Sequence, residues 1–188
     1  MILATNNKGK LEEIKKIFNE YEIYSLKDKN IDIDVVEDQD TFVGNAKKKA
    51  IEIYNLTHEE VIADDSGLCI KALNDFPGVM THRFLGENAT NLERNEYLIK
   101  EVNKHEDRSA YVVCTLVYYD GNEIIIGTGR IEGFISKERR GENGFGFDEI
   151  FELPNGLTLA EMSKEEKNKI SARYLAAKDL KEKILKLK

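Results

Sequence analysis

The sequence predicts an α/β fold in which a mixed sheet is flanked by helices. In the first half of the chain, short apolar segments alternate with stretches of helical periodicity, and in the second half two long β-like segments are joined by a turn. A helical pattern then dominates the C-terminal end. The 188 residues suffice for one domain with its own core, or for two small lobes.

The first part of the chain predicts a strand, a helix and a second strand, followed by a loop and another helix. Residues 1–4 are apolar and fit a short buried strand, and residues 22–26 fit a second one. Between them, residues 8–20 repeat apolar side chains at helical spacing. The acidic residues 31–40 predict a loop or a sheet edge, whereas residues 41–54 repeat apolar side chains every four positions and predict a helix.

The stretch VIADDSGL runs apolar and then turns acidic. Residues 61–63 predict a short buried strand, and residues 68–70 are expected to continue the chain beyond a kink. Aspartate, serine and glycine are common turn formers, so a surface turn explains the intervening residues. A catalytic or metal-binding carboxylate at the rigid end of a strand explains them equally well. Residues 75–86, which contain Pro77 and nearby glycines, predict irregular structure.

The second half carries a further helix and a hairpin. Residues 91–103 predict a helix, and residues 110–119 and 123–131 predict strands that the tripeptide Asp-Gly-Asn joins in a hairpin. A glycine-rich loop, RRGENGFGFDEIF, comes next, and helix dominates from about residue 163. No internal repeat and no low-complexity linker interrupts the sequence.

Composition and charge exclude several classes of protein. The chain is 41% hydrophobic and 34% charged, as in globular proteins, and its net charge of −7 argues against broad binding to nucleic acid. No apolar run is long enough to span a membrane, and the first residues lack the apolar core of a secretory signal. Cys69 and Cys114 stand in apolar runs without metal-ligand spacing, which predicts buried free thiols and a cytoplasmic location.

A polar turn follows the first predicted strand. It consists of Thr5, Asn6, Asn7, Lys8, Gly9 and Lys10. A strand-to-helix turn presents backbone N–H groups and the positive end of a helix dipole, which suits a phosphate. The spacing is not that of a Walker A loop, and an ordinary capped helix with exposed lysines explains the same residues.

Carboxylates precede the helix predicted over residues 41–54. Glu37 and Asp38 would stabilise the N-terminus of that helix, which is a sufficient structural explanation. One of them could instead share a Mg²⁺ ion with Asp64 or Asp65, because this cation on nucleotide substrates commonly uses one or two carboxylates with phosphate oxygens. Separation in sequence does not show that these groups meet.

The last two stretches that could carry chemistry are the glycine-rich loop and the segment SKEEKNKISAR, in which Ser163 and Glu166 match a capping box. Phe145 and Phe147 could stack on a planar base or fill the core beside the hairpin. Lys167 and Arg173 lie six residues apart and would face different directions on one continuous helix. If both meet one ligand, we expect the helix to break between them, with Ser171 capping a second helix. A single long surface helix is the alternative.

The order of these motifs is more specific than any one of them. The blocks ILATNNKGK, TFVGNAKKKA, VIADDSGL, PGV, GFGFDEIF and AEMSKEEKNKISAR resemble the inosine triphosphate pyrophosphatase family over nearly the whole chain. The resemblance implies one such domain over residues 1–188, with an elongated sheet and two lobes enclosing a nucleotide-binding cleft. It also implies a homodimer that hydrolyses nonstandard purine nucleoside triphosphates (ITP, dITP, XTP) to the monophosphate and pyrophosphate with Mg²⁺, cleansing the nucleotide pool.

The resemblance also implies roles for individual residues. Asp65 matches the family's catalytic aspartate and metal ligand, and Glu37 matches its second metal carboxylate. The positions that match substrate contacts are Thr5, Asn6, Asn7, Lys8, Gly9, Lys10, Lys49, Ser66, Phe145, Gly146, Phe147, Asp148, Lys167, Ala172 and Arg173.

Three positions depart from the family pattern. Asn6 stands where glycine is usual, Gly44 where glutamate is common, and Ala172 where histidine usually precedes the arginine. The last departure removes a donor near the base, so we expect weaker preference for ITP over ATP or GTP. Two other functions stay open, a Maf-like nucleotide pyrophosphatase with other base preference and a protein that binds purine nucleotides without cutting them.

Overall fold

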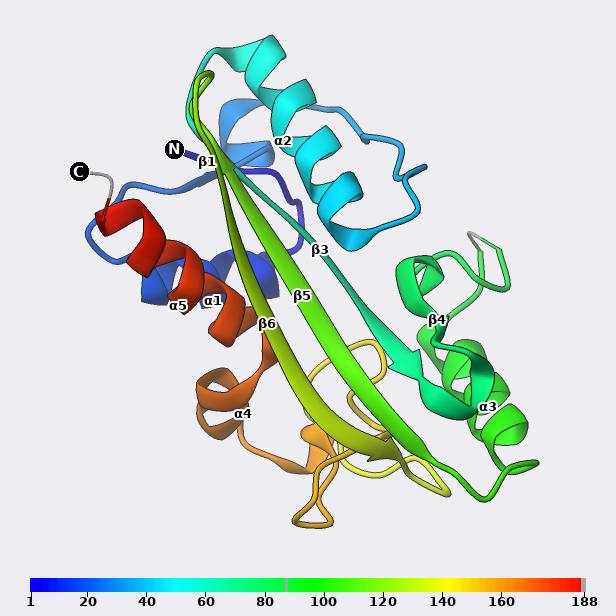
Figure 1. Cartoon of the computed structure of the whole chain (residues 1–188). Coiled ribbons are helices and arrows are strands. Elements are labelled where there is room, and N and C mark those ends of the chain that lie inside the picture. The colour runs from blue at the N-terminus through cyan, green and yellow to red at the C-terminus, as the bar shows by residue number, and fades with distance from the viewer. Residues whose placement is uncertain (87, 187–188) are drawn as a thin grey trace. The chain divides into compact units, whose positions relative to one another are not determined.

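The computed structural model describes residues 1–86 and 88–186, and the chain divides into two compact units (Figure 1). The first unit comprises Met1–Ser66, Cys114–Gly129 and the segment that begins at Ala172, and the second comprises Gly67–Val113 and Arg130–Ser171. The single domain over residues 1–188 and the cleft between two lobes stay predictions.

The strands form the mixed sheet that the sequence predicts. Their order is β2-β1-β3-β5-β6-β7, with β4 paired to β3. The bounds are β1 Ile2–Leu3, β2 Tyr24–Ser25, β3 Val61–Ile70, β4 Phe76–Pro77, β5 Ser109–Tyr119, β6 Ile124–Ile135 and β7 Phe151–Glu152. In the first unit β1 lies parallel to both β2 and β3, and in the second unit β4 and β7 run antiparallel to their partners.

Three helices cover the sheet of the first unit. They are α1 (Lys8–Ile17), α2 (Phe42–Thr57) and α5 (Ala172–Leu185). Figure 1 shows α1 and α5 side by side on one side of the strands and α2 on the other. Ala46, Ala50 and Ile53 of α2 pack on Ile2 and Val61, all of them fully buried. The expected helices over residues 8–20 and 41–54 are confirmed, with shifted ends.

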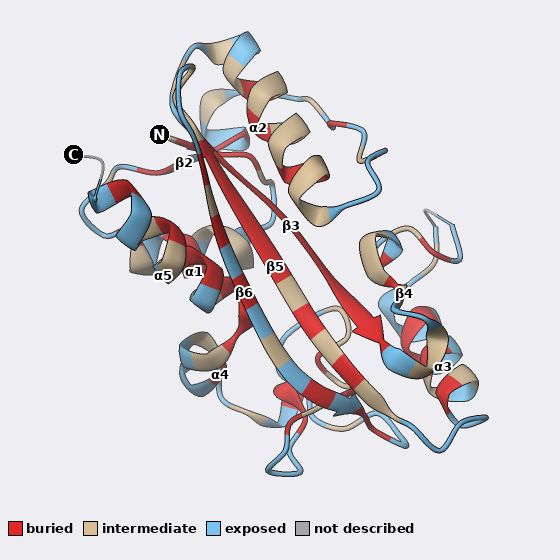
Figure 2. Ribbon diagram, in the orientation of Figure 1, coloured by how far each residue is buried: buried red, intermediate tan, exposed pale blue. Residues whose placement is uncertain are grey.

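The expectation of a short strand that ends at the acidic residues is wrong. β3 continues without interruption from Val61 to Ile70, and every one of its residues is buried (Figure 2). Asp64 and Asp65 therefore lie inside a strand and not in a turn. A buried carboxylate is tolerated in a strand only where charged or hydrogen-bonding partners meet it, and both aspartates have such partners.

The predicted hairpin is present and is longer than expected. The Asp120 Oδ1 atom accepts hydrogen bonds from the backbone N–H groups of Asn122 and Glu123. Gly121 has a φ of 98°, and a Cβ atom there would lie 2.1 Å from the Tyr54 hydroxyl oxygen, so both the backbone and the space require glycine. β6 then continues to Ile135, four residues beyond the expected end.

The second unit carries two helices, α3 (Asn91–Val102) and α4 (Lys164–Ile170). Each begins with a capping box, formed by Thr90 with Glu93 and by Ser163 with Glu166, and the second of these was expected from the sequence. Short 3₁₀ turns cover Lys71–Leu73, Gly78–Met80 and Leu159–Glu161, and a further one in the first unit covers Lys27–Lys29.

The helical C-terminal segment breaks where a shared ligand would require it. α4 ends at Ile170, Ser171 takes an extended conformation with φ −61° and ψ 150°, and α5 begins at Ala172. The single long helix is thus excluded. Arg173 lies in the first turn of α5, whereas Lys167 belongs to α4.

Both cysteines are free and buried, as expected. Burial raises the pKa of the Cys114 thiol to about 12 and also raises that of Cys69, so neither is a ready nucleophile at neutral pH. Within the part of the chain that the structure describes, no helix has the length and apolar character needed to cross a membrane.

Candidate active site

The N-terminal polar turn is organised by its own side chains. Asn7 caps α1, because its Oδ1 atom accepts hydrogen bonds from the N–H groups of Gly9 (2.9 Å) and Lys10 (3.2 Å). The Thr5 hydroxyl oxygen in turn accepts a hydrogen bond from the Asn7 N–H group at 3.1 Å. Asn6, Asn7 and Lys8 are exposed at the positive end of the helix. Asn7 therefore caps the helix as the capped-helix interpretation expects, and the exposed polar groups remain available to an anion.

Lys10 does not extend into solvent as that interpretation assumed. Its Nζ atom lies 2.9 Å from the Oδ2 atom of Asp64, which is 2% exposed. The Arg173 Nε atom lies 3.6 Å from the same oxygen. Burial alone would raise the pKa of Asp64, but the positive charges of Lys10, Arg173 and Lys49 hold that pKa well below its usual range. Asp64 is therefore a buried permanent anion.

Arg173 is held by more than Asp64. Its Nη1 atom donates to Glu13 Oε2 at 2.9 Å, and its Nη2 atom lies 3.5 Å from the Ser66 hydroxyl. Glu13 and Arg173 are both buried, on α1 and α5. These contacts stabilise the packing of α5 on α1. Ala172, which precedes Arg173, is itself 3% exposed.

Asp65 occupies a different environment from its neighbour. Its Oδ2 atom accepts a hydrogen bond from Asn45 Nδ2 at 2.9 Å, and its Oδ1 atom accepts one from the Ser66 N–H group at 2.8 Å. Burial, followed by the negative charge of Glu37, raises the pKa of Asp65 to about 6. A carboxylate in this range can take up and release a proton near neutral pH.

Lys49 joins the segment before α2 to β3. Its Nζ atom donates to Glu37 Oε1 at 2.6 Å and to the backbone carbonyl of Asp64 at 2.8 Å. Burial would lower the pKa of Lys49, but the charges of Asp64 and Glu37 outweigh that effect and raise it. Lys49 therefore stays protonated and holds Glu37 in the neighbourhood of Asp65. We refer to Lys10, Glu37, Lys49, Asp64, Asp65 and Arg173 as the carboxylate cluster.

The carboxylate cluster contains acids that could hold a metal ion. Among the described residues, no group of three or more histidine, cysteine, aspartate or glutamate side chains is placed to do so. Glu37 and Asp65 offer two carboxylates, which is the number that a Mg²⁺ ion commonly takes from a protein when substrate phosphates complete its shell. Asp64 is a poor candidate ligand because Lys10 and Arg173 already occupy its carboxylate.

A second set of predicted residues meets inside the second unit. The Asp148 Oδ2 atom accepts hydrogen bonds from the Phe145 N–H group at 2.7 Å and from the Lys167 ammonium group. The Lys167 Nζ atom also lies 4.6 Å from the centre of the Phe145 ring. Asp148 and Lys167 are buried, whereas Phe145 is 39% exposed. The Phe145 ring is thus exposed in part and not enclosed in the core, so the interpretation of Phe145 as core filling is wrong.

Gly146 and Phe147 belong to the same loop. Gly146 has a φ of 66°, and its carbonyl accepts a hydrogen bond from Asn95 Nδ2 at 2.9 Å. Phe147 is partly buried and its carbonyl accepts hydrogen bonds from the backbone of Ile150 and Phe151. We refer to Phe145, Gly146, Asp148 and Lys167 as the aromatic cluster.

Sequence reasoning missed three residues that support these clusters, namely Glu13, Asn45 and Asn95. Each is a buried polar side chain on a helix. Glu13 lies three residues after Lys10 and beside the apolar Ile14, and that position on the buried face was the available signal. For Asn45 and Asn95, an amide on a face otherwise predicted to be buried was the only hint.

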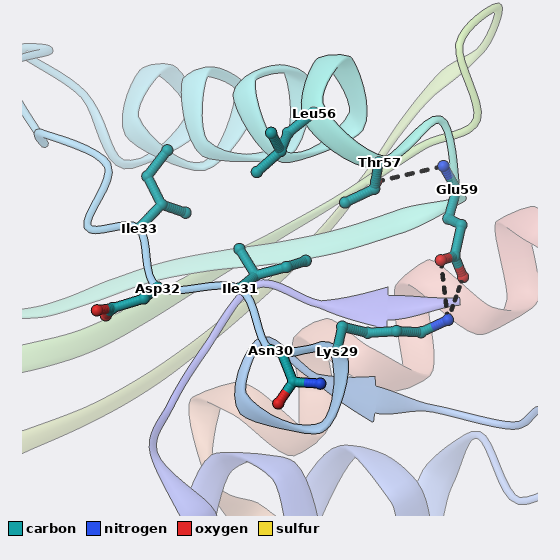
Figure 3. A pocket seen from close by; sticks show the side chains of 8 residues that line it. All are labelled: Lys29, Asn30, Ile31, Asp32, Ile33, Leu56, Thr57 and Glu59. Atoms are coloured by element: carbon teal, nitrogen blue, oxygen red, sulfur yellow. Dashed lines mark hydrogen bonds and ion pairs between the residues drawn. The ribbon is translucent and has the colours of Figure 1, made fainter.

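A separate surface cavity of about 570 Å³ lies in the first unit (Figure 3). It is lined by Lys29, Asn30, Ile31, Asp32, Ile33, Leu56, Thr57 and Glu59. The Lys29 ammonium group lies 2.7 Å from the Glu59 carboxylate, so the charges at that end neutralise each other. None of the predicted site residues lines this cavity.

Comparison with known proteins gives matches along the whole chain. The Ham1 family matches residues 1–183. A dITP/XTP pyrophosphatase of Clostridium tetani is 40% identical, over 98% of this chain and 95% of the relative. A dITP/XTP pyrophosphatase of a Thermoanaerobacter species is 44% identical, over 99% and 96%.

Solved structures of two Ham1 proteins are similar to this chain over nearly its whole length. The Staphylococcus aureus Ham1 protein superposes with a TM-score of 0.92 at 36% identity, covering 100% of this chain and 98% of that one. A HAM1 protein from Coxiella burnetii gives a TM-score of 0.91 at 36% identity, with 98% of each chain covered.

Proposed function

The chain belongs to the Ham1 family, and from that premise we propose that it is a nucleoside triphosphate pyrophosphatase. It hydrolyses nonstandard purine nucleoside triphosphates (dITP, XTP and ITP) to the nucleoside monophosphate and pyrophosphate. Relatives that share at least 40% of their residues with it along nearly the whole chain are named dITP/XTP pyrophosphatases. The observation that carries the proposal is that Lys49, which also contacts the Asp64 carbonyl, holds Glu37 where its negative charge helps to raise the pKa of Asp65.

We assign a divalent cation, Mg²⁺, to Glu37 and Asp65. These two residues suit a Mg²⁺ ion because the negative charge of Glu37 acts on Asp65 and raises its pKa. A cation bound to both carboxylates would relieve that electrostatic repulsion. When bound, Mg²⁺ neutralises charge on the triphosphate and on the leaving pyrophosphate. Lys49 keeps Glu37 oriented through its 2.6 Å contact.

Asp65 acts as the base that activates water. Its ionised carboxylate accepts a proton from the attacking water, whose oxygen bonds to the α-phosphorus while the bond to the β-phosphate oxygen breaks. The Asn45 and Ser66 hydrogen bonds fix the orientation of the carboxylate. A pKa of about 6 in the metal-free protein already leaves Asp65 predominantly ionised at neutral pH, and a bound cation would keep it ionised.

The remaining predicted residues divide between phosphate and base. The polar groups from Thr5 to Lys8 and the α1 N-terminus take phosphate oxygens, and Lys10 and Lys49 add positive charge. The half-exposed Phe145 ring stacks on the purine, and Lys167 donates to its 6-oxo group. Arg173 and Ala172 stay predicted to approach the purine, with Arg173 fixed through Glu13.

Product analysis tests the proposal. We expect ITP and XTP, incubated with the protein and Mg²⁺, to give monophosphate and pyrophosphate, with GTP, ATP and dUTP as comparison substrates. Asp65→Asn removes the base and should abolish turnover while nucleotide binding is largely retained. Diphosphate and orthophosphate as products would contradict cleavage between the α- and β-phosphates. Binding without turnover of any nucleotide would favour the non-catalytic alternative.

The choice of pyrophosphatase family, the homodimer and the cytoplasmic location rest on separate observations. The match to the Ham1 family along the chain favours this activity over the Maf-like alternative. The homodimer is carried over from the family resemblance, and sedimentation equilibrium tests it by giving either one or two times the 21.5 kDa chain mass. The cytoplasmic location rests on the two buried free thiols.

A further inference from the structure

Asn95 is a buried polar residue that the proposed chemistry does not use. It lies in the middle of α3 and is 2% exposed. Asparagine has low helix propensity, and a buried amide is costly unless it finds partners. An apolar side chain at this position would avoid that cost, so the partner of the amide is informative.

The partner of Asn95 is the loop that carries the aromatic cluster. Its Nδ2 atom donates to the Gly146 carbonyl oxygen at 2.9 Å, across 51 residues of sequence. The side chains of Arg94, Asn95 and Leu98 also line a small cavity together with Gly146 and Phe147, which shows that α3 packs along this loop.

The loop needs such support at its middle. Gly144 and Gly146 both have positive φ, 84° and 66°, so this backbone is irregular and cannot be held by a regular ladder. Its two ends are tied to one neighbouring residue, because the Asn143 N–H group donates to the Ala160 carbonyl and the Ala160 N–H group donates to the Asp148 carbonyl. The hydrogen bond from Asn95 to the Gly146 carbonyl lies, along the sequence, between these two attachment points.

Contacts of α3 with the preceding segment hold Asn95 in position for this hydrogen bond. The Thr90–Glu93 capping box fixes its start. Arg94 donates from Nε to the Phe84 carbonyl at 3.0 Å and from Nη2 to the Gly86 carbonyl at 2.8 Å. The residue next to Asn95 thus ties the helix to the preceding segment, and the amide is held where the carbonyl meets it.

We propose that Asn95 is a positioning residue for base selection, which fixes the Gly146 carbonyl and thereby the orientation of Phe145 and of the Asp148–Lys167 pair. The inference deepens the proposed pyrophosphatase function and rests on it. The Phe145 N–H group donates to Asp148, and Asp148 pairs with Lys167, so a shift of the loop at Gly146 moves the stacking ring and the base donor together. Asn95 belongs to the second unit, whereas Glu37 and Asp65 belong to the first.

The test uses Asn95→Leu, which keeps the number and branching of the side-chain heavy atoms and removes the donor, and Asn95→Ser, which shortens the side chain. Lys100→Ala is the control on the same helix, because Lys100 is exposed and does not line the cavity that Asn95 shares with Gly146 and Phe147. We expect the kcat/KM ratio of ITP over ATP to fall about tenfold in both Asn95 variants, mainly through KM for ITP, as loss of one buried hydrogen bond permits. Of these two nucleotides only ITP carries the 6-oxo group that Lys167 is proposed to meet. kcat should stay within about twofold, since the catalytic carboxylates are untouched.

Amide hydrogen exchange supplies a readout without nucleotide. We expect the Phe145 and Asp148 amides to exchange about tenfold faster in the Asn95 variants, while α3 keeps its protection and Lys100→Ala matches the wild type. Unchanged loop exchange, or an equal loss of kcat on every nucleotide, would overturn the positioning role. If the wild type cuts no nucleotide, the pyrophosphatase proposal fails by itself, and the exchange rates still show whether Asn95 holds the loop.

Discussion

Asp64 and Asp65 are adjacent, and yet their pKa values are displaced in opposite directions. Successive side chains of a strand point to opposite faces of the sheet. Asp64 accordingly meets Lys10 of α1 and Arg173 of α5, whereas Asp65 meets Asn45 of α2. Figure 1 shows α1 and α5 on one side of β3 and α2 on the other. The two carboxylates therefore differ because different helices cover them.

The raised pKa of Asp65 predicts a pH-dependent stability of the metal-free protein. A carboxyl group with a pKa of about 6 when folded and 3.8 when unfolded binds its proton more tightly in the folded state. Its stabilising contribution is complete below the unfolded value and is lost as pH rises through the folded value. From pH 4 to pH 8 we expect a loss of about 2 kcal/mol relative to Asp65→Asn.

Urea unfolding with EDTA measures this loss for both proteins across that range. The Asp65→Asn variant removes the titrating group and keeps Asp64, so the difference between the two curves isolates Asp65. Parallel curves would mean that the pKa of Asp65 is ordinary in solution.

Ala172 carries the prediction about base selectivity. It lies buried at the start of α5, where related chains commonly carry a histidine according to the resemblance noted above. Ala172→His should raise the kcat/KM ratio of ITP over ATP and GTP, because it restores a donor near the base. Rates for the three nucleotides give the ratio, and thermal unfolding checks that the larger side chain is accommodated. An unchanged ratio in a folded variant contradicts the prediction.

At the scale of elements, two adjacent lysines of α2 make different kinds of contact, and only that of Lys49 reaches β3. Lys49 contacts Glu37 and the Asp64 carbonyl, and its side chain is 14% exposed. Lys48 pairs with Asp38, whose side chain is 54% exposed. A buried charge that loses its partner is costly, whereas a surface ion pair contributes little.

We therefore expect Lys49→Met to lower the free energy of unfolding by about 3 kcal/mol, because Glu37 and the carbonyl lose their donor. Lys48→Met, the neighbouring control, should cost less than about 0.5 kcal/mol. Chemical denaturation at pH 7 compares them. Equal costs for the two variants would show that Lys49 does not anchor the helix.

For the whole molecule, ligand binding and stability should be linked. Mg²⁺ together with a nonhydrolysable ITP analogue binds only the folded chain, so at about one hundred times Kd it should add roughly 2.7 kcal/mol. Thermal unfolding should then shift upward by several degrees, on the order of 2–4 °C per kcal/mol for a chain of this size.

The variant Glu37→Gln removes one of the two proposed metal ligands. It should lose the part of the shift that depends on Mg²⁺ and keep the part that the analogue gives with EDTA. A full Mg²⁺-dependent shift in this variant would place the cation elsewhere.

Much of the fold followed from local pattern. The helices, the hairpin at Gly121 and the capping box at Ser163 depend on residues close together in sequence, so periodicity and turn chemistry suffice to predict them. The prediction that a strand is interrupted at VIADDSGL was wrong. Local rules count two aspartates as turn formers, and only their partners on three helices make a continuous buried strand possible.

The sequence by itself determined the α/β class, the order of the motifs and the residue types that could hold phosphate, metal and base. Only the tertiary structure decided which of those residues meet and in which state of charge. Lys10, Glu13, Asp64 and Arg173 converge from α1, β3 and α5, and Asn95 reaches Gly146 across 51 residues. Burial and long-range pairing set the pKa of a side chain, and neither is a property of its neighbours in sequence.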